Sequence, residues 1–183
     1  MLLNETVKWI VLTAFFEEPE REYYVKELAK KFKVSPSSAS RVCSELEKEG
    51  LLGSHEKGRA IFYSLRGAEP LVLRLKSAWF VNRLMKFRRC WETEEIQSVA
   101  LYGSRASGEF ISKSDVDIIV ISNATTEALE KSFELLKKEF GERASLTIFS
   151  VAQWRKLARQ KDRFYIEVLA NHVLLFGPSL VIG

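Results

Sequence analysis

The sequence predicts an α+β protein built from two parts. Apolar residues recur at helical spacing through much of the first third of the chain, whereas residues 98–102 and 114–121 are typical of short strands in the second half. The first of these runs leads into a Gly-Ser pair, and the second contains an Asp-x-Asp pair. A chain of 183 residues can bury one or two small cores, so two small domains are compatible with its length.

The charge of the chain is unevenly distributed. The net charge is +4, from 28 Lys and Arg residues against 24 Asp and Glu residues. Residues 21–66 hold ten basic and six acidic residues, so this stretch carries the whole excess. No run of about 18 apolar residues occurs that could span a bilayer. We therefore expect a soluble, cytoplasmic protein that does not enter a membrane.

Cysteine and histidine are sparse. Cys43 and Cys90 lack the spacing of a metal or redox motif and the density of a disulfide scaffold, which favours two reduced thiols. The two histidines, His55 and His172, are also isolated. The sequence therefore gives little support for a zinc site.

Three helices are predicted in the first fifty residues, at 5–16, 23–32 and 36–49. Asn4 is the expected N-cap of the first helix, which ends before Pro19. Ser35 is expected to cap the third helix, with Pro36 at its first position, where no backbone donor is needed. Gly50 ends the third helix.

A β-hairpin is predicted to follow, with strands at residues 52–56 and 59–65 joined at Lys57-Gly58. Three helices followed by a hairpin with a basic tip form the layout of a winged helix-turn-helix. The stretch ELAKKFKVSPSSASRVCSELEKEGLL, residues 27–52, resembles the recognition half of bacterial and archaeal winged-helix regulators.

The third helix and the hairpin tip carry the residues expected to contact DNA. Short hydroxyl side chains and one Arg near the start of a helix suit phosphate and major-groove contacts, and a basic wing tip suits the flanking backbone. The predicted DNA-binding residues are Ser37, Ser38, Ser40, Arg41, Lys57 and Arg59. Winged helices also serve as dimerisation or protein-docking modules, and this alternative stays open.

A long connecting helix is predicted after the hairpin, ending in the basic residues Lys86, Arg88 and Arg89, which favour a helix C-terminus. This helix would join two domains and offers a seam for a homodimer. We therefore expect a winged-helix domain at residues 1–67, a connecting helix at 68–92 and a second domain at 93–183.

The second domain contains residues that suit phosphate and metal chemistry. Asp115 and Asp117 alternate on a predicted strand, so both carboxylates project from one face. Carboxylate oxygens are the ligands that Mg²⁺ prefers. Gly103 permits a tight turn, and Ser104 at the start of the following helix offers donors to phosphate oxygens.

The stretch LYGSRASGEFISKSDVDIIVI, residues 101–121, resembles the signature of the DNA polymerase β nucleotidyltransferase superfamily. Ten residues separate Ser104 from Asp115, as in the minimal nucleotidyltransferases. The resemblance implies a mixed β-sheet flanked by helices, with Mg²⁺ as cofactor and ATP or another nucleoside triphosphate as substrate. It assigns the catalytic and metal-binding roles to Asp115 and Asp117, and nucleotide binding to Gly103, Ser104 and Arg105.

One part of the family pattern is not evident. Active members carry a third carboxylate on a later strand, which should correspond to residues 144–150, after a helix at 125–140. Here Ser145 and Thr147 occupy the expected face, and a hydroxyl is a poor base near neutral pH. Glu142 lies just before this strand and is the nearest acidic residue in the sequence.

Two functions of different class therefore remain open. The first is Mg²⁺-dependent transfer of AMP from ATP to a hydroxyl of a protein or small molecule, with an antitoxin-like role against a partner toxin as the resemblance suggests. The second is a transcriptional regulator whose nucleotidyltransferase-like domain binds a nucleotide or a partner without catalysis.

Overall fold

The computed structural model describes residues 6–181, apart from the side chains of residues 126, 130 and 132. The chain divides into two compact units, Met1–Lys76 and Ser77–Gly183. Within the described part of the chain, no helix combines the length and apolar character needed to span a membrane.

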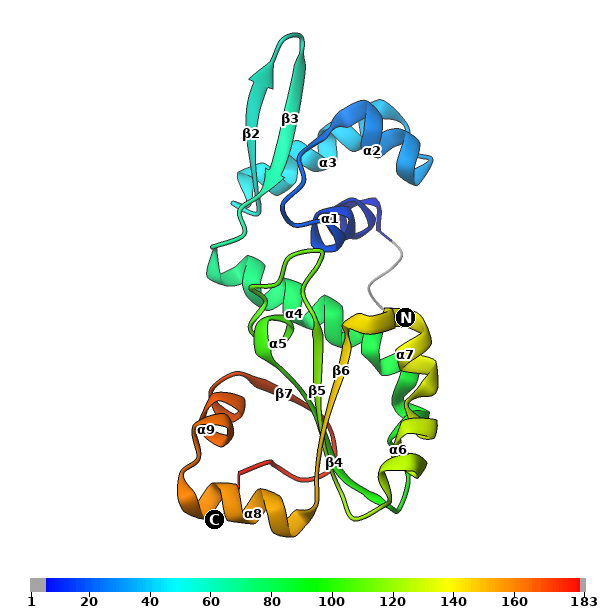
Figure 1. The fold of residues 1–183 in the computed structure, drawn as a ribbon. Coiled ribbons are helices and arrows are strands. Elements are labelled where there is room, and N and C mark those ends of the chain that lie inside the picture. Colours follow the sequence, from blue (N-terminus) through cyan, green and yellow to red (C-terminus); the bar gives the residue numbers. More distant parts are fainter. Residues whose placement is uncertain (1–5, 182–183) are drawn as a thin grey trace. The chain divides into compact units, whose positions relative to one another are not determined.

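The first unit combines three helices with a small antiparallel sheet (Figure 1). The strands β1, β3 and β2 are hydrogen-bonded in that order. The elements are α1 (Val7–Glu17), β1 (Tyr23–Tyr24), α2 (Val25–Phe32), α3 (Pro36–Lys48), β2 (Leu52–Lys57) and β3 (Ala60–Leu65).

The three predicted helices are confirmed, with corrections at their starts. The side chain of Ser35 caps α3, and Pro36 is its first residue, as expected. The N-cap of α1 is Thr6, whose hydroxyl accepts a hydrogen bond from the Trp9 amide. The cap expected at Asn4 lies outside the described residues.

Two local predictions for the first unit are wrong. Residues Tyr23 and Tyr24, predicted as helix, form a short strand because β3 offers them a partner. The hairpin turn lies one residue later than predicted, at Gly58-Arg59, since β2 continues through Lys57. Gly58 has a φ of 66°, a conformation that glycine adopts without steric cost.

The predicted connecting helix is interrupted. An α-helix, α4, runs from Pro70 to Leu84, and a 3-10 helix, η1, continues from Met85 to Cys90. The division between the two units falls inside α4.

The second unit is built on a four-stranded mixed sheet, as the family resemblance implied. Its strand order is β6-β5-β4-β7, with β5 and β6 parallel and the other pairs antiparallel. The strands are β4 (Ile96–Tyr102), β5 (Val116–Ser122), β6 (Ala144–Phe149) and β7 (His172–Phe176).

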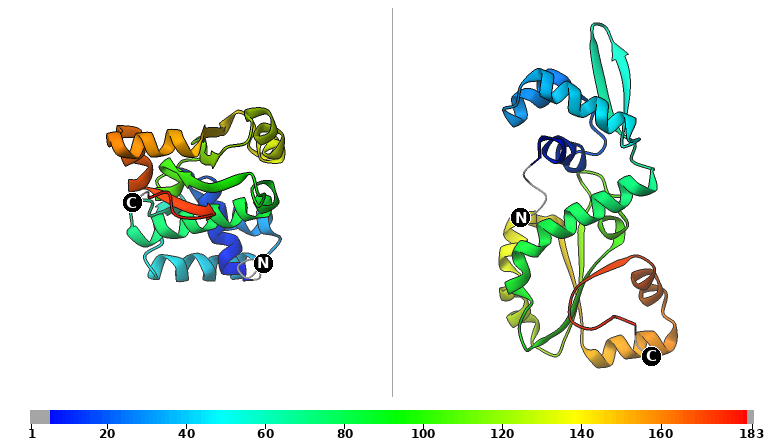
Figure 2. Two further views of the ribbon diagram at one scale, coloured as in Figure 1. Left: turned by 90° about the horizontal axis from the view of Figure 1, so that it is seen from below. Right: turned by 180° about the vertical axis from the view of Figure 1, so that it is seen from behind.

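Helices lie on both faces of this sheet (Figure 2). The helix predicted at 125–140 is divided at Phe133 into two short helices. The helical elements are α5 (Gly103–Ser107), α6 (Thr126–Ser132), α7 (Glu134–Phe140), η2 (Gly141–Arg143), α8 (Val151–Gln160) and α9 (Arg163–Ala170). The α+β class predicted from the sequence is therefore confirmed.

A buried cluster joins α8 and α9 to one face of the sheet. Trp154 of α8 packs with Ile119 and Ile121 of β5, and its ring centroid lies 4.8 Å from that of Tyr165 in α9. The indole N–H of Trp154 donates a 3.0 Å hydrogen bond to the carbonyl of Leu180. Since side chains alternate along β5, Asp117 projects from the same face as Ile119, next to this helical layer.

Candidate functional site

The turn after β4 brings the two halves of the Gly-Ser and Asp-x-Asp motif together. Gly103 follows the last residue of β4 and has a φ of 70°. A Cβ atom at this position would lie only 2.6 Å from Oδ2 of Asp117. The absence of a side chain therefore allows the Asp117 carboxylate to lie directly against the turn.

Strand pairing fixes the position of Asp117. This residue is paired with Tyr102 of β4 on one side and with Ser145 of β6 on the other. Its side chain is half-buried, whereas Asp115, just before β5, is exposed. Both carboxylates thus lie at the end of the sheet that carries the Gly103 turn.

The environment disfavours the ionised form of Asp117. Burial raises the pKa of this carboxyl group above its ordinary value, the negative charge of Asp115 raises it further, and the positive charge of Arg105 opposes both effects. A cation placed between the two carboxylates would remove their repulsion.

Arg105 is committed to the loop that precedes Asp115. It is only 5% exposed, and its guanidinium donates hydrogen bonds to the carbonyls of Asp115, at 2.8 Å, and Ser114, at 2.6 Å. The guanidinium carbon also lies 4.3 Å from the ring centroid of Phe80 and 4.8 Å from that of Phe110. Arg105 therefore holds this loop in position, and the phosphate contact expected of it from the sequence stays a prediction.

Burial also lowers the pKa of Arg105. Loss of hydration lowers the pKa of its guanidinium to about 10, and the nearby positive charges of Arg143 and Arg83 act in the same direction. The group remains protonated at neutral pH, because even this lowered pKa lies well above 7.

Hydroxyl groups occupy the position expected for a third carboxylate. Ser145 is the β6 partner of Asp117, and Thr147 lies two residues further along the strand. The Thr147 hydroxyl is 3.0 Å from that of Tyr102. Glu142 lies in η2 and is exposed. Among residues 6–181, no group of three or more His, Cys, Asp or Glu side chains is arranged to hold a metal ion.

A cavity of about 350 Å³ adjoins the Gly103 turn. This volume lies in the range of small-molecule sites. The sequence patterns did not indicate the wall of this cavity that α9 and the following residue form, which includes Phe164 and Asn171. The lining residues are Tyr102, Gly103, Ser104, Ser107, Glu109, Phe164, Glu167, Val168 and Asn171.

A known protein family matches this part of the chain. Residues 84–173 match the family model of the nucleotidyltransferase domain. The matched segment contains Gly103, both aspartates and the whole of β4, β5 and β6. We refer to it below as the nucleotidyltransferase domain. No curated protein matches the chain.

Several solved structures show a more distant likeness. A toxin–antitoxin complex with AMP-PNP is 19% identical over 54% of this chain and 74% of the matched chain, with a TM-score of 0.36. A mutant MntA–HpeT toxin–antitoxin is 16% identical over 54% and 74% of the two chains, also with a TM-score of 0.36. A complex of the tri-AMPylated Shewanella oneidensis HEPN toxin with its MNT antitoxin is 16% identical over 56% and 73%, with a TM-score of 0.33.

In the first unit, three of the residues predicted to contact DNA line one groove. Ser37 and Ser40 of α3 and Arg59 of the hairpin turn border a cavity of about 660 Å³, together with Lys26 and the exposed Ile61. The structure thus brings the start of α3 and the turn end of the hairpin together.

The other three predicted residues lie apart from this groove. Arg41 forms a 3.2 Å ion pair with Glu45 one helical turn later. The backbone amide of Ser38 donates to the Ser35 cap. The Lys57 ammonium lies 5.8 Å from the ring centroid of Phe62.

Replacing Gly103 with alanine should damage the site more than the fold. A Cβ at this φ costs about 1–2 kcal/mol of unfolding free energy, and the Asp117 carboxylate must move away to avoid it. Gly50→Ala is the matched control, because Gly50 has a similar φ of 77° and no heavy atom within 4 Å of the added Cβ. Denaturant unfolding should show similar losses for both variants, while calorimetry should show weaker Mg²⁺-nucleotide binding for Gly103→Ala alone. Equal nucleotide binding by the two variants would contradict this role of Gly103.

Asp117→Asn should make the protein more stable at neutral pH. Because the carboxyl pKa is raised in the folded protein, the unfolded chain releases this proton first as the pH rises. The free energy of unfolding therefore falls as the pH rises from the unfolded-state pKa to the higher folded-state pKa of this carboxyl group. Thermal unfolding should show a higher Tm for the variant at pH 7, and this gain should disappear below the ordinary carboxyl pKa. If Asp117→Asn has the same Tm as the wild type at pH 7, ionisation of Asp117 does not lower the free energy of unfolding.

Proposed function

We propose that the nucleotidyltransferase domain binds a nucleoside triphosphate with Mg²⁺ and transfers AMP from ATP to a hydroxyl group. The observation that carries this proposal is the direct approach of the Asp117 carboxylate to the Gly103 turn, beside a cavity of small-molecule size. A metal-bound triphosphate needs acidic ligands and a phosphate-binding turn at one place, and this is the combination present here.

The residues of the site fit a magnesium ion. Asp115 and Asp117 supply oxygen ligands, and the cost of keeping Asp117 ionised beside Asp115 is relieved by a bound cation. Arg105 holds the loop that presents Asp115. When bound, Mg²⁺ neutralises phosphate charge and assists the departure of pyrophosphate.

The rest of the site would bind and orient the nucleotide. The Gly103 turn and the Ser104 hydroxyl face the cavity and would contact the phosphate oxygens, while Phe164 and Asn171 offer an aromatic face and an amide to the base or sugar. In the transfer, the acceptor oxygen bonds to the α-phosphorus, the bond from that phosphorus to the bridging oxygen breaks, and pyrophosphate leaves. The acceptor proton passes to water.

The acceptor hydroxyl belongs, in our proposal, to a protein or a small molecule. The resemblance of residues 101–121 to the minimal nucleotidyltransferases favours a partner toxin as acceptor, which would give the chain an antitoxin-like role.

A second candidate is nucleotide binding without transfer. It is favoured by the position of Ser145 beside Asp117, where active members of the resembled family place a carboxylate. Without that carboxylate a base or metal ligand is missing, which slows transfer by orders of magnitude. The chain would then act as a regulator whose nucleotide site senses a ligand.

We further infer that the first unit is a winged helix-turn-helix that binds DNA. Three helices followed by the β2–β3 hairpin support this assignment. The groove between α3 and the hairpin combines Arg59 with the hydroxyls of Ser37 and Ser40, which suit phosphate contacts.

The nucleotide site is tested by calorimetric titration with ATP, GTP, CTP and UTP in Mg²⁺. Asp115→Asn/Asp117→Asn should abolish Mg²⁺-dependent binding, because it removes both metal ligands. Glu94→Gln/Glu95→Gln is the matched control, since it removes two exposed carboxylates of the same unit. Equal binding by the two double variants would refute the site.

Transfer is then tested by incubating the wild-type protein with ATP labelled at the α-phosphate and a lysate of its source cells. Label that becomes attached to an acceptor, and is absent with the double aspartate variant, supports the transferase. Binding without any transfer supports the regulator.

DNA binding is tested by fluorescence anisotropy with a random-sequence duplex. Arg59→Gln should weaken binding about ten-fold and reduce the slope of log K against log salt concentration by about 1, because one phosphate contact is lost. Lys48→Gln removes an exposed charge at the opposite end of α3 and should have little effect. A wild-type protein that does not bind the duplex would favour a protein-docking role for this unit.

A further inference from the structure

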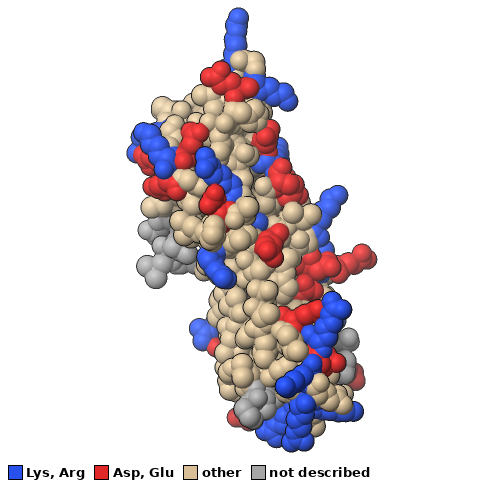
Figure 3. Space-filling model, turned by 90° about the vertical axis from the view of Figure 1, so that its left-hand side faces the viewer, with Lys and Arg blue, Asp and Glu red and all other residues tan. Residues whose placement is uncertain are grey.

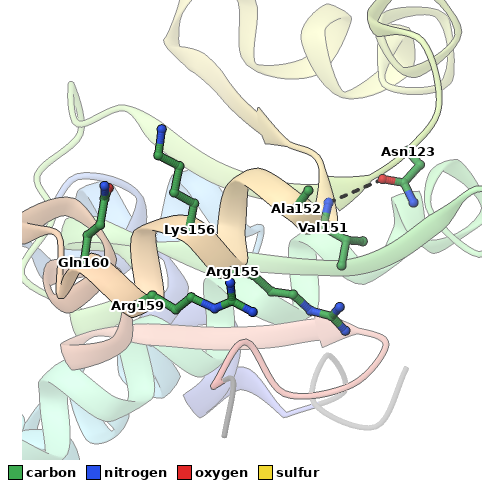
Figure 4. Close-up of a pocket in the computed structure, with 7 residues that line it drawn as sticks. All are labelled: Asn123, Val151, Ala152, Arg155, Lys156, Arg159 and Gln160. Carbon is green, nitrogen blue, oxygen red and sulfur yellow. Dashed lines mark hydrogen bonds between the residues drawn. The ribbon is translucent and has the colours of Figure 1, made fainter.

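A second pocket lies on the nucleotidyltransferase domain, away from the aspartate pair. Its volume is about 640 Å³, and its lining includes Arg155, Lys156 and Arg159 of α8 and Asn123 (Figure 4). Asn123 directly follows the last residue of β5, whereas Asp117 is the second residue of that strand. At about 3.3 Å per residue, the two ends are about 20 Å apart, so this pocket is separate from the proposed nucleotide site.

In the part of the chain that the structure describes, the three cations of this pocket have no acidic partners. None of the described residues forms an ion pair with Arg155, Lys156 or Arg159. No Asp or Glu is among the residues that line the pocket. In Figure 3, Lys and Arg side chains gather at the lower end of the view, the end at which Figure 1 places α8.

The nearest acidic residues after α8 in the sequence are already engaged. Asp162 caps α9 by accepting a hydrogen bond from the Phe164 amide. Glu167 accepts a 2.7 Å ion-paired hydrogen bond from Arg163. The positive charge of α8 is therefore not balanced by these neighbours.

The backbone at the start of α8 is also satisfied within the protein. Ser150 and Gln153 form a reciprocal capping box, and the Val151 amide donates to Asn123 at 3.4 Å. An anion at this pocket would therefore bind mainly to the basic side chains.

The spacing of the basic residues and the types of residue that line the pocket indicate the chemistry of the ligand. Positions 155 and 159 are separated by about 6 Å along the helix axis, which suits a ligand with several negative groups rather than one. Among the described residues of the lining, Val151 and Ala152 are the only apolar ones, so this part of the pocket lacks the aromatic or large aliphatic anchors typical of protein interfaces. The described lining residues also include no aromatic ring for base stacking.

We propose that this pocket is a second anion site, which binds closely spaced phosphate groups through Arg155, Lys156 and Arg159. Such groups occur in free polyphosphate compounds and along a nucleic-acid strand, and the pocket recognises the phosphates rather than the bases. This site does not depend on the proposed transferase activity.

The test is calorimetric titration of the full-length protein with inorganic tripolyphosphate in EDTA, which removes Mg²⁺. Arg155→Gln/Lys156→Gln/Arg159→Gln should bind this probe at least ten-fold more weakly than the wild type. Lys48→Gln/Arg74→Gln/Arg89→Gln removes the same charge from other exposed positions and should bind as the wild type does.

Further measurements separate this site from the nucleotide site and identify the phosphate source. Asp115→Asn/Asp117→Asn should retain tripolyphosphate binding in EDTA even if all nucleotide binding is lost. If a nucleic-acid strand is the source, the α8 triple variant should also lower the salt-dependence slope for a 12-nucleotide single strand by about 2. If the α8 triple variant changes only the binding of tripolyphosphate, the phosphate groups that this pocket binds come from a free polyphosphate compound.

The α8 triple variant and its control variant replace only exposed side chains, and thermal unfolding should show unchanged Tm values for both. Equal tripolyphosphate binding by the α8 variant, the control variant and the wild type would overturn the proposal and leave α8 as a solvated basic helix.

Discussion

The register between β4 and β5 is the constraint on which the candidate site depends. It places Tyr102, the last residue before the Gly103 turn, beside Asp117. The carboxylate then lies so close to the turn that no Cβ fits at residue 103 without moving it. A shift of one residue in this pairing would turn Asp117 to the opposite face of the sheet, away from the cavity and from α9.

This arrangement carries an electrostatic cost that suits a cation site. The pKa of Asp117 is raised by burial and by Asp115, so the folded protein holds a carboxylate that it would stabilise better with a bound metal. Arg105 does not neutralise the pair by direct contact, because its hydrogen bonds go to the backbone carbonyls of Ser114 and Asp115. Its burial against Phe80 and Phe110 instead keeps the loop in place. Perturbed carboxylates beside a cavity are typical of functional sites.

Acidic and basic groups lie at opposite ends of the parallel strands β5 and β6. Acidic groups and the Gly103 turn lie where β5 begins, and the basic residues of α8 follow where β6 ends. Between them, Trp154 and Tyr165 pack α8 and α9 onto Ile119 and Ile121. The same helical layer therefore supplies Phe164 to the cavity near Asp117 and Arg155 to the pocket at the other end.

Features that depend on neighbouring residues were predictable from the sequence. The Ser35 cap with Pro36 and the alternation that puts Asp115 and Asp117 on one face both follow from local stereochemistry and from the spacing of short motifs. The α+β class and the mixed sheet followed from the same patterns and from the family resemblance. Local signals were sufficient there because each element satisfies its own backbone groups or carries its own periodicity.

Only the tertiary structure decided the features that require a distant partner. Tyr23 and Tyr24 become a strand because β3, about forty residues later, completes their hydrogen bonds. The direction in which the Arg105 side chain points depends on its packing against Phe80 and Phe110. The cavity beside the Gly103 turn forms because α9 folds back next to that turn. These outcomes depend on packing and hydrogen bonds between segments far apart in the chain, and no local pattern of residue types specifies which partner each side chain will find.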